Sequence, residues 1–173
     1  MTEGVFGRAR RRLTSVGILG GFVVLALPAA AGAASISVPG TVNLGSVPTG
    51  AGTLSAQMGT VTATASGIVL PSFVATVSST DFTTGGGSSA QTIAKASISY
   101  WSGPVTASIG AQTPLPGQLT ALQKVSLSTS REAFRSSGLV LSMSTSWNPT
   151  IVITIPAAVV AGTYTGTITH SVA

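Results

Sequence analysis

The chain contains no cysteine among its 173 residues, and charged side chains make up only 6% of it. The absence of cysteine excludes disulfide bonds, a lipid-modified N-terminal cysteine, thiol catalysis and cysteine-ligated metals. Aromatic residues are also few, at 5%, whereas 44% of the residues are hydrophobic. A chain of this composition must rely mainly on an apolar core, because disulfide bonds and charge networks are not available.

The basic residues are concentrated near the N-terminus. The formal net charge is +5, and half of the eight basic residues lie in one short stretch, at Arg8, Arg10, Arg11 and Arg12. An apolar segment, residues 16–27, and the A-x-A sequence at residues 31–33 follow. These are the three parts of a secretory signal peptide. We therefore predict that residues 1–33 are a signal peptide cleaved near Ala33 or Ala34, exported by either the general or the twin-arginine route.

Residues 34–173 are the predicted mature protein, a single secreted domain. They keep four basic and two acidic side chains, which is too sparse for the clustered basic face that nucleic-acid binding requires. About 140 residues suffice for one domain with its own core. We expect no nucleic-acid partner, no cofactor and no membrane association after processing.

Alternating apolar and polar residues dominate the sequence beyond residue 41. Residues 60–65 and 163–172 place threonine at alternate positions, a pattern typical of half-buried β-strands. Glycine-rich and proline-containing turns such as residues 85–87 separate these runs at intervals typical of an antiparallel sandwich. Only residues 131–136 suggest helical character. The sequence predicts an all-β, immunoglobulin-like antiparallel sandwich of about eight to ten strands.

Residues suited to catalysis are scarce. A hydrolase triad needs a nucleophile, a base and an orienting acid, but the chain has one histidine, His170, and beyond the leader only Asp81 and Glu132 as acids. No G-x-S-x-G sequence is present. One histidine and two separated carboxylates also make a poor set of metal ligands. We expect a noncatalytic protein without a metal site.

The two tryptophans are candidates for ligand contact. Trp101 lies on the otherwise hydroxylated side of its predicted strand, and Trp147 ends a strand just before Asn148-Pro149. An exposed aromatic ring can stack on the face of a sugar, and loops at strand ends often carry binding sites. The alternative is that each ring closes one end of the core.

Several segments also occur in a distinctive order, namely residues 44–47, 59–63, 73–82, 151–156 and 161–169. This order, with the ending Ala-Gly-Thr-Tyr-Thr-Gly-Thr, resembles the WxL-type surface domains of Gram-positive bacteria over nearly the whole predicted mature chain. The resemblance implies a sandwich fold, noncovalent attachment to peptidoglycan and, with the alanine- and glycine-rich composition, an actinobacterial source. At the positions of the two W-x-L motifs the chain has Phe73-Val74-Ala75 and His170-Ser171-Val172, so both tryptophans are replaced.

The sequence therefore predicts a secreted, noncatalytic protein of the cell envelope. Its predicted partner is peptidoglycan or another surface protein, bound noncovalently through Phe73, Trp101 and His170. The alternative is a structural subunit that self-assembles into a surface filament or layer by strand addition or edge pairing. The expected edge is Ile151, Val152 and Ile153, because this segment is apolar, β-branched and uncharged.

Overall fold

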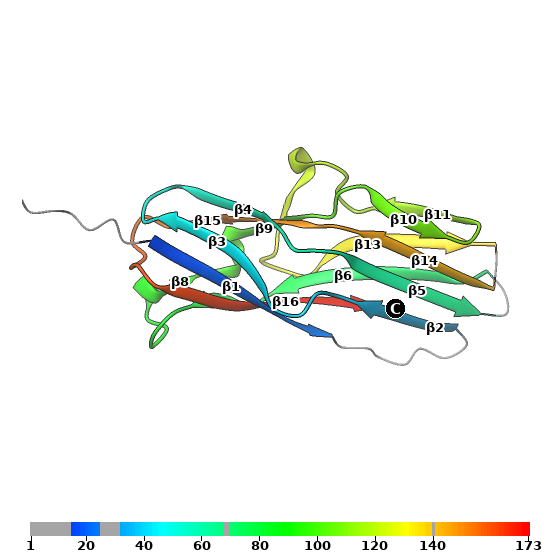
Figure 1. The fold of residues 1–173 in the computed structure, drawn as a ribbon, viewed down its shortest axis with the longest axis horizontal. Coiled ribbons are helices and arrows are strands. Elements are labelled where there is room, and N and C mark those ends of the chain that lie inside the picture. The colour runs from blue at the N-terminus through cyan, green and yellow to red at the C-terminus, as the bar shows by residue number, and fades with distance from the viewer. Residues whose placement is uncertain (1–14, 25–31, 68–69, 140) are drawn as a thin grey trace, which may run out of the picture.

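The computed structural model describes residues 15–24, 32–67, 70–139 and 141–173. The predicted basic region at residues 8–12 lies outside these ranges. Within them the chain is almost entirely β-structure, arranged as an elongated sandwich (Figure 1). The predicted all-β fold is therefore confirmed.

The described residues form sixteen strands, more than expected because several are only two residues long. In chain order they are β1 (Ser15–Val24), β2 (Gly32–Ser37), β3 (Val42–Pro48), β4 (Thr53–Gln57), β5 (Val61–Gly67), β6 (Ser72–Ser79), β7 (Phe82–Thr83), β8 (Thr92–Ile93), β9 (Ile98–Trp101), β10 (Val105–Ile109), β11 (Gln112–Pro116), β12 (Val125–Ser126), β13 (Arg131–Gly138), β14 (Ser142–Trp147), β15 (Thr150–Thr154) and β16 (Thr163–Val172). Three single-turn 3₁₀ helices, η1 (Ser89–Gln91), η2 (Lys95–Ser97) and η3 (Ala121–Gln123), lie in the connections.

The strands form three hydrogen-bonded sheets. The largest has the order β11-β13-β6-β16-β1-β3, with β7 and β8 attached beside β16. Two four-stranded sheets, β10-β14-β5-β2 and β12-β9-β15-β4, form the opposite side of the sandwich (Figure 1). Every pairing among the described strands is antiparallel except that of β1 with β16, which is parallel.

The two four-stranded sheets meet where the chain bends between β4 and β5 and again between β14 and β15. The second bend contains Pro149, which has no N–H to continue a ladder. Its carbonyl oxygen instead accepts a hydrogen bond from the N–H of Met58 at 2.9 Å. The side-chain oxygen of Asn148 accepts one from the N–H of Gly59 at 3.1 Å. These two bonds hold the two bends together.

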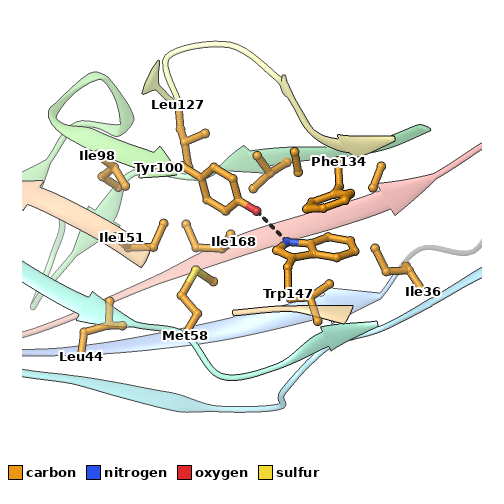
Figure 2. Close-up of a cluster of buried hydrophobic side chains, with 14 of the residues drawn as sticks. Ile36, Leu44, Met58, Ile98, Tyr100, Leu127, Phe134, Trp147, Ile151 and Ile168 are labelled. Carbon is orange, nitrogen blue, oxygen red and sulfur yellow. Dashed lines mark hydrogen bonds between the residues drawn. The ribbon is translucent and has the colours of Figure 1, made fainter. Parts of the chain in front are cut away.

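The core follows from the alternation seen in the sequence (Figure 2). Along β5, Val61, Ala63 and Ala65 are buried while the residues between them are partly exposed. Strands β6 and β16 follow the same rule over most of their length. The buried side chains of all three sheets form one cluster, so a single core holds the sandwich together.

Residues 131–136, for which helical character was expected, form strand β13 instead. β13 lies between β11 and β6. A register shift between Glu132 and Phe134 leaves both Ala133 and Phe134 buried. This bulge interrupts the two-residue alternation by which a strand is recognised, and that explains why the prediction was wrong.

The expected assembly edge at Ile151, Val152 and Ile153 is also wrong. These residues lie in β15, which pairs with β9 on one side and with β4 on the other. Ile151 and Ile153 are 1% and 0% exposed. An apolar, β-branched run is typical both of an unprotected edge and of a strand buried inside a sheet, and here it is the second.

The apolar part of the predicted signal peptide contributes strand β1, which lies between β16 and β3 (Figure 1). Residues 17–24 pair in parallel with residues 163–170. The expected cleavage position falls within β2, where Ala33 and Ala34 pair with β5. In the part of the chain that the structure describes, no helix is long and apolar enough to cross a membrane.

Replacing Gly166 by alanine should destabilise the protein strongly. A Cβ atom at this position of β16 would overlap the ring of Phe82, which is fully buried. Overpacking of this kind should lower the free energy of unfolding by about 3 kcal/mol, measured by urea denaturation. The control is Gly86→Ala, because the nearest atom to its added Cβ is the Gln91 side-chain oxygen at 3.7 Å. Equal stability of the two variants would contradict the close packing of Gly166 against the Phe82 ring.

Candidate functional site

Of the three side chains expected to contact the cell wall, only Trp101 has accessible surface. Phe73 is 1% exposed and His170 is 0% exposed. A ring must present a free face to stack on a sugar, and neither of these rings does. The expectation that Phe73 and His170 contact a partner is therefore wrong for the folded chain.

The position of His170 follows from the register of β16. It lies on the same face as Tyr164 and Ile168, and it stands opposite Val77 of β6. The alternation of the sequence had placed His170, Tyr164 and Ile168 on one face. The sequence could not show that the opposite layer covers this face completely, because that layer comes from distant segments, including β9 and β14.

His170 belongs to a small polar cluster inside the core. The indole N–H of Trp147 donates a hydrogen bond to the hydroxyl oxygen of Tyr100 at 3.1 Å, drawn in Figure 2. The same oxygen lies 3.3 Å from Nε2 of His170. Phe134 stacks on the Trp147 ring with a centroid separation of 4.8 Å. The four side chains come from β9, β13, β14 and β16, so they connect all three sheets.

Burial controls the protonation states in this cluster. Loss of contact with water lowers the pKa of His170 to about 4, so its ring is neutral at pH 7. Burial also raises the pKa of Tyr100, and the hydrogen bond from Trp147 only partly offsets this. Nδ1 of His170 is buried and has no hydrogen-bond partner among the described protein atoms. The cluster is closed to substrates, and we interpret it as structural.

The two carboxylates outside the leader take part in local contacts. Asp81 accepts a hydrogen bond from the backbone N–H of Lys95 at 2.7 Å. Glu132 lies 3.7 Å from Nε of Arg135, and both side chains are largely exposed. Within the described ranges, no three acidic or histidine side chains come close enough together to hold a metal ion.

Trp101 lies at the end of β9, on the face opposite to buried Tyr100. It pairs with Thr150 of β15, and its ring carbon Cζ3 lies 3.6 Å from the site of a Cβ on Gly103. The following residue, Ser102, donates to the carbonyl of Gln118 at 2.8 Å and accepts its N–H at 3.1 Å. The ring is therefore partly exposed and carried on a rigid support.

The face around Trp101 is mostly polar and neutral. Ser99 lies two residues before Trp101 in β9, on the same face of the sheet. It pairs with Val152 of β15, and Ser55 of β4 pairs with Val152 from the other side. Gln57 stands beside Thr150 in the next strand and is exposed. Hydroxyl and amide groups around a partly exposed indole suit a ligand that presents both an apolar face and hydrogen-bonding groups.

Two further surface features were not expected from the sequence. The first is an open recess beside β16, lined by Thr41, Thr80, Asp81, Thr83, Thr165, Gly166 and Thr167. Its threonines come from three separate stretches of the chain, so only the alternation within β16 was visible as a signal. The recess contains hydroxyl groups and one carboxylate, but no aromatic ring.

The second feature is a group of exposed aliphatic side chains at one end of the sandwich. Leu70, Ile109, Leu139 and Leu141 are between 61% and 81% exposed. They lie in the β5–β6 and β13–β14 connections and at the last residue of β10, and Figure 1 shows these places at the same end of the sandwich. The connections are joined by backbone hydrogen bonds, including one from Leu139 N–H to the carbonyl of Ala111 at 2.9 Å.

Acid should destabilise the protein through His170. Its pKa is about 4 when folded and about 6.5 when unfolded, so the unfolded state binds more protons between these values. The free energy of unfolding should be level above pH 7 and fall as the pH drops from 6.5 to 4. The whole effect is on the order of 3 kcal/mol, measurable by urea denaturation across pH.

The chain has a single histidine, so one imidazole NMR resonance reports this titration directly. The variant His170→Gln should be less stable than the unmodified protein at pH 7. Because glutamine does not titrate, the free energy of unfolding of this variant should change little between pH 5 and 7. A histidine resonance that titrates near pH 6.5 in the folded protein would contradict the burial of this ring.

Comparison with known proteins leaves the chain without an assigned family. No family model matches it, and no curated protein matches it. The resemblance to WxL-type domains therefore stays a prediction.

Proposed function

We propose that the protein is a noncatalytic, secreted protein of the cell envelope that binds wall polymer or a surface protein through Trp101. The observation that carries this proposal is the selective exposure of that ring. Trp147, Phe73 and His170 are buried, whereas Trp101 keeps accessible surface on a polar face. A partly exposed tryptophan on a rigid strand is costly to leave in water and is typical of a contact residue.

The charge distribution supports a neutral partner such as a glycan. The face around Trp101 presents Ser55, Ser99 and Gln57, none of which is charged. Binding there would rest on ring stacking and hydrogen bonds, so salt should weaken it little. A partner held by charge would instead be released at high ionic strength.

Trp101→Ala should weaken binding of the exported protein to purified peptidoglycan sacculi about tenfold, because the stacking contribution of one ring is roughly 1.5 kcal/mol. The measurement is cosedimentation at low and at high salt. The matched control is Leu122→Ala, since Leu122 is 96% exposed and lies in η3. Equal binding by the two variants, or no binding by the unmodified protein, would refute the wall-binding role of Trp101.

A second candidate function, a self-assembling structural subunit, is favoured by a different observation. The sheet that contains β16 is completed by β1, a strand contributed by the predicted signal peptide. Removal of that strand would leave unpaired backbone groups, which are the usual basis of strand addition between molecules.

Self-assembly predicts that the particle size of the exported protein grows with concentration. Light scattering between micromolar and millimolar concentrations measures this directly, and the unprocessed chain is the control because β1 is still present. A processed protein that stays monomeric over the whole range would exclude the self-assembling subunit without affecting the test of wall binding.

A further inference from the structure

Strand β16 is paired along both of its sides. On one side, residues 168–172 pair with β6, and Thr165 pairs with β7. On the other side, residues 163–170 pair with β1. β3 belongs to this sheet only through β1, because the strand order runs β16-β1-β3. The loss of β1 would therefore leave one side of β16 without a partner over eight residues.

Hydrogen bonds show which backbone groups of β16 face each side. The N–H of Thr167 donates to the Thr80 hydroxyl at 2.9 Å, and its carbonyl accepts the Thr80 N–H at 2.9 Å. Ala173 exchanges two bonds with Val74 of β6 in the same way. Backbone groups alternate in direction along a strand. The even-numbered residues from Tyr164 to His170 therefore direct their N–H and C=O groups toward β1.

The exposed side of β16 would be suited to a second copy of the same strand. Residues 163–172 contain no Asp, Glu, Lys, Arg or Pro, so none of the usual features that block edge pairing is present. The outer face carries threonine at four alternate positions, 163, 165, 167 and 169. Threonine pairs across antiparallel strands are favourable.

We propose that removal of the signal peptide opens β16 as an interaction edge, and that two copies of the processed chain pair there, β16 against β16, about a two-fold axis. The proposal rests on the self-assembling function above and supplies the contact of its first step, the dimer. Until processing, β1 occupies the edge and keeps the chain monomeric. The pairing is isologous and closes on itself, so the dimer is the smallest unit of the assembly.

With the axis at Thr167, residues 164–170 of the two copies pair with one another, which are seven of the eight residues that β1 had covered. Thr165 of one copy then faces Thr169 of the other, and Gly166 faces Ile168. All threonines remain on one face of the joined sheets. Since the backbone groups of Thr167 point toward β6, the two Thr167 residues form a non-hydrogen-bonded pair, with Cα atoms about 4.5 Å apart.

This spacing allows a direct test by disulfide trapping. The chain has no cysteine, so a Thr167→Cys variant can form a disulfide only between molecules, and about 4.5 Å is within the range for a disulfide. The whole chain is produced with its own leader in a bacterium that exports it, and intact mass identifies the processed product. After mild oxidation, the exported form should be mostly disulfide-linked dimer, whereas unprocessed chain should stay largely monomeric.

Two controls define the register. Leu122→Cys, on the exposed η3 turn, gives the background of random crosslinking. Thr165→Cys and Thr169→Cys should each crosslink poorly alone, because in this pairing neither residue faces its own copy. A mixture of the two variants should give a mixed disulfide at least fivefold above that background.

The main rival is that β3 moves beside β16 within the same molecule once β1 is gone. β3 is antiparallel to β1, and β1 is parallel to β16, so β3 could pair with β16 in the antiparallel direction. A monomeric exported protein with only background crosslinking at residue 167 would overturn both the pairing and the self-assembly proposal. Growth in particle size with only background crosslinking at residue 167 would overturn the β16 pairing alone. An exported product whose mass still includes residues 15–24 would also overturn the inference, because the edge would then never open.

Discussion

One buried contact joins all three sheets of this protein. Tyr100 receives the indole N–H of Trp147, and His170 lies against the same hydroxyl oxygen. The three residues come from β9, β14 and β16, one strand from each sheet. In a chain without disulfides and almost without charge, this contact and the apolar cluster around it decide which face of each strand turns inward. Once His170 and Ile168 are buried, the direction of every backbone group of β16 is fixed.

This constraint separates structural aromatic residues from those available for contact. Phe73 and His170, at which the predicted WxL resemblance places the two motif tryptophans, are both core residues in this fold. Trp101 follows Tyr100 in the sequence and must therefore point out of the same sheet that Tyr100 packs beneath. Of the three ring-bearing side chains expected to contact a partner, only Trp101 presents its ring on a polar face.

Much of the fold could be predicted from the sequence because alternation is a local property. The inward residues of β5, β6 and β16 are those that the two-residue period indicates. Strand neighbours are not local, and there the sequence was misleading. The composition of β15 suits an edge as well as an interior strand, and the bulge at Ala133 hid β13. Likewise, nothing in residues 15–24 beyond their apolar character indicated that they would pair with β16.

Amide hydrogen exchange along β16 in the exported protein tests the central claim, that the even-numbered backbone groups of this strand form an edge that β1 covers before processing and a second copy covers afterwards. The amides of Gly166 and Ile168 should be protected at high protein concentration and become labile on dilution. The amide of Thr167, bonded to Thr80, should stay protected throughout. Protection of Gly166 and Ile168 that is independent of concentration would contradict the account, because their partner would then lie within the same molecule.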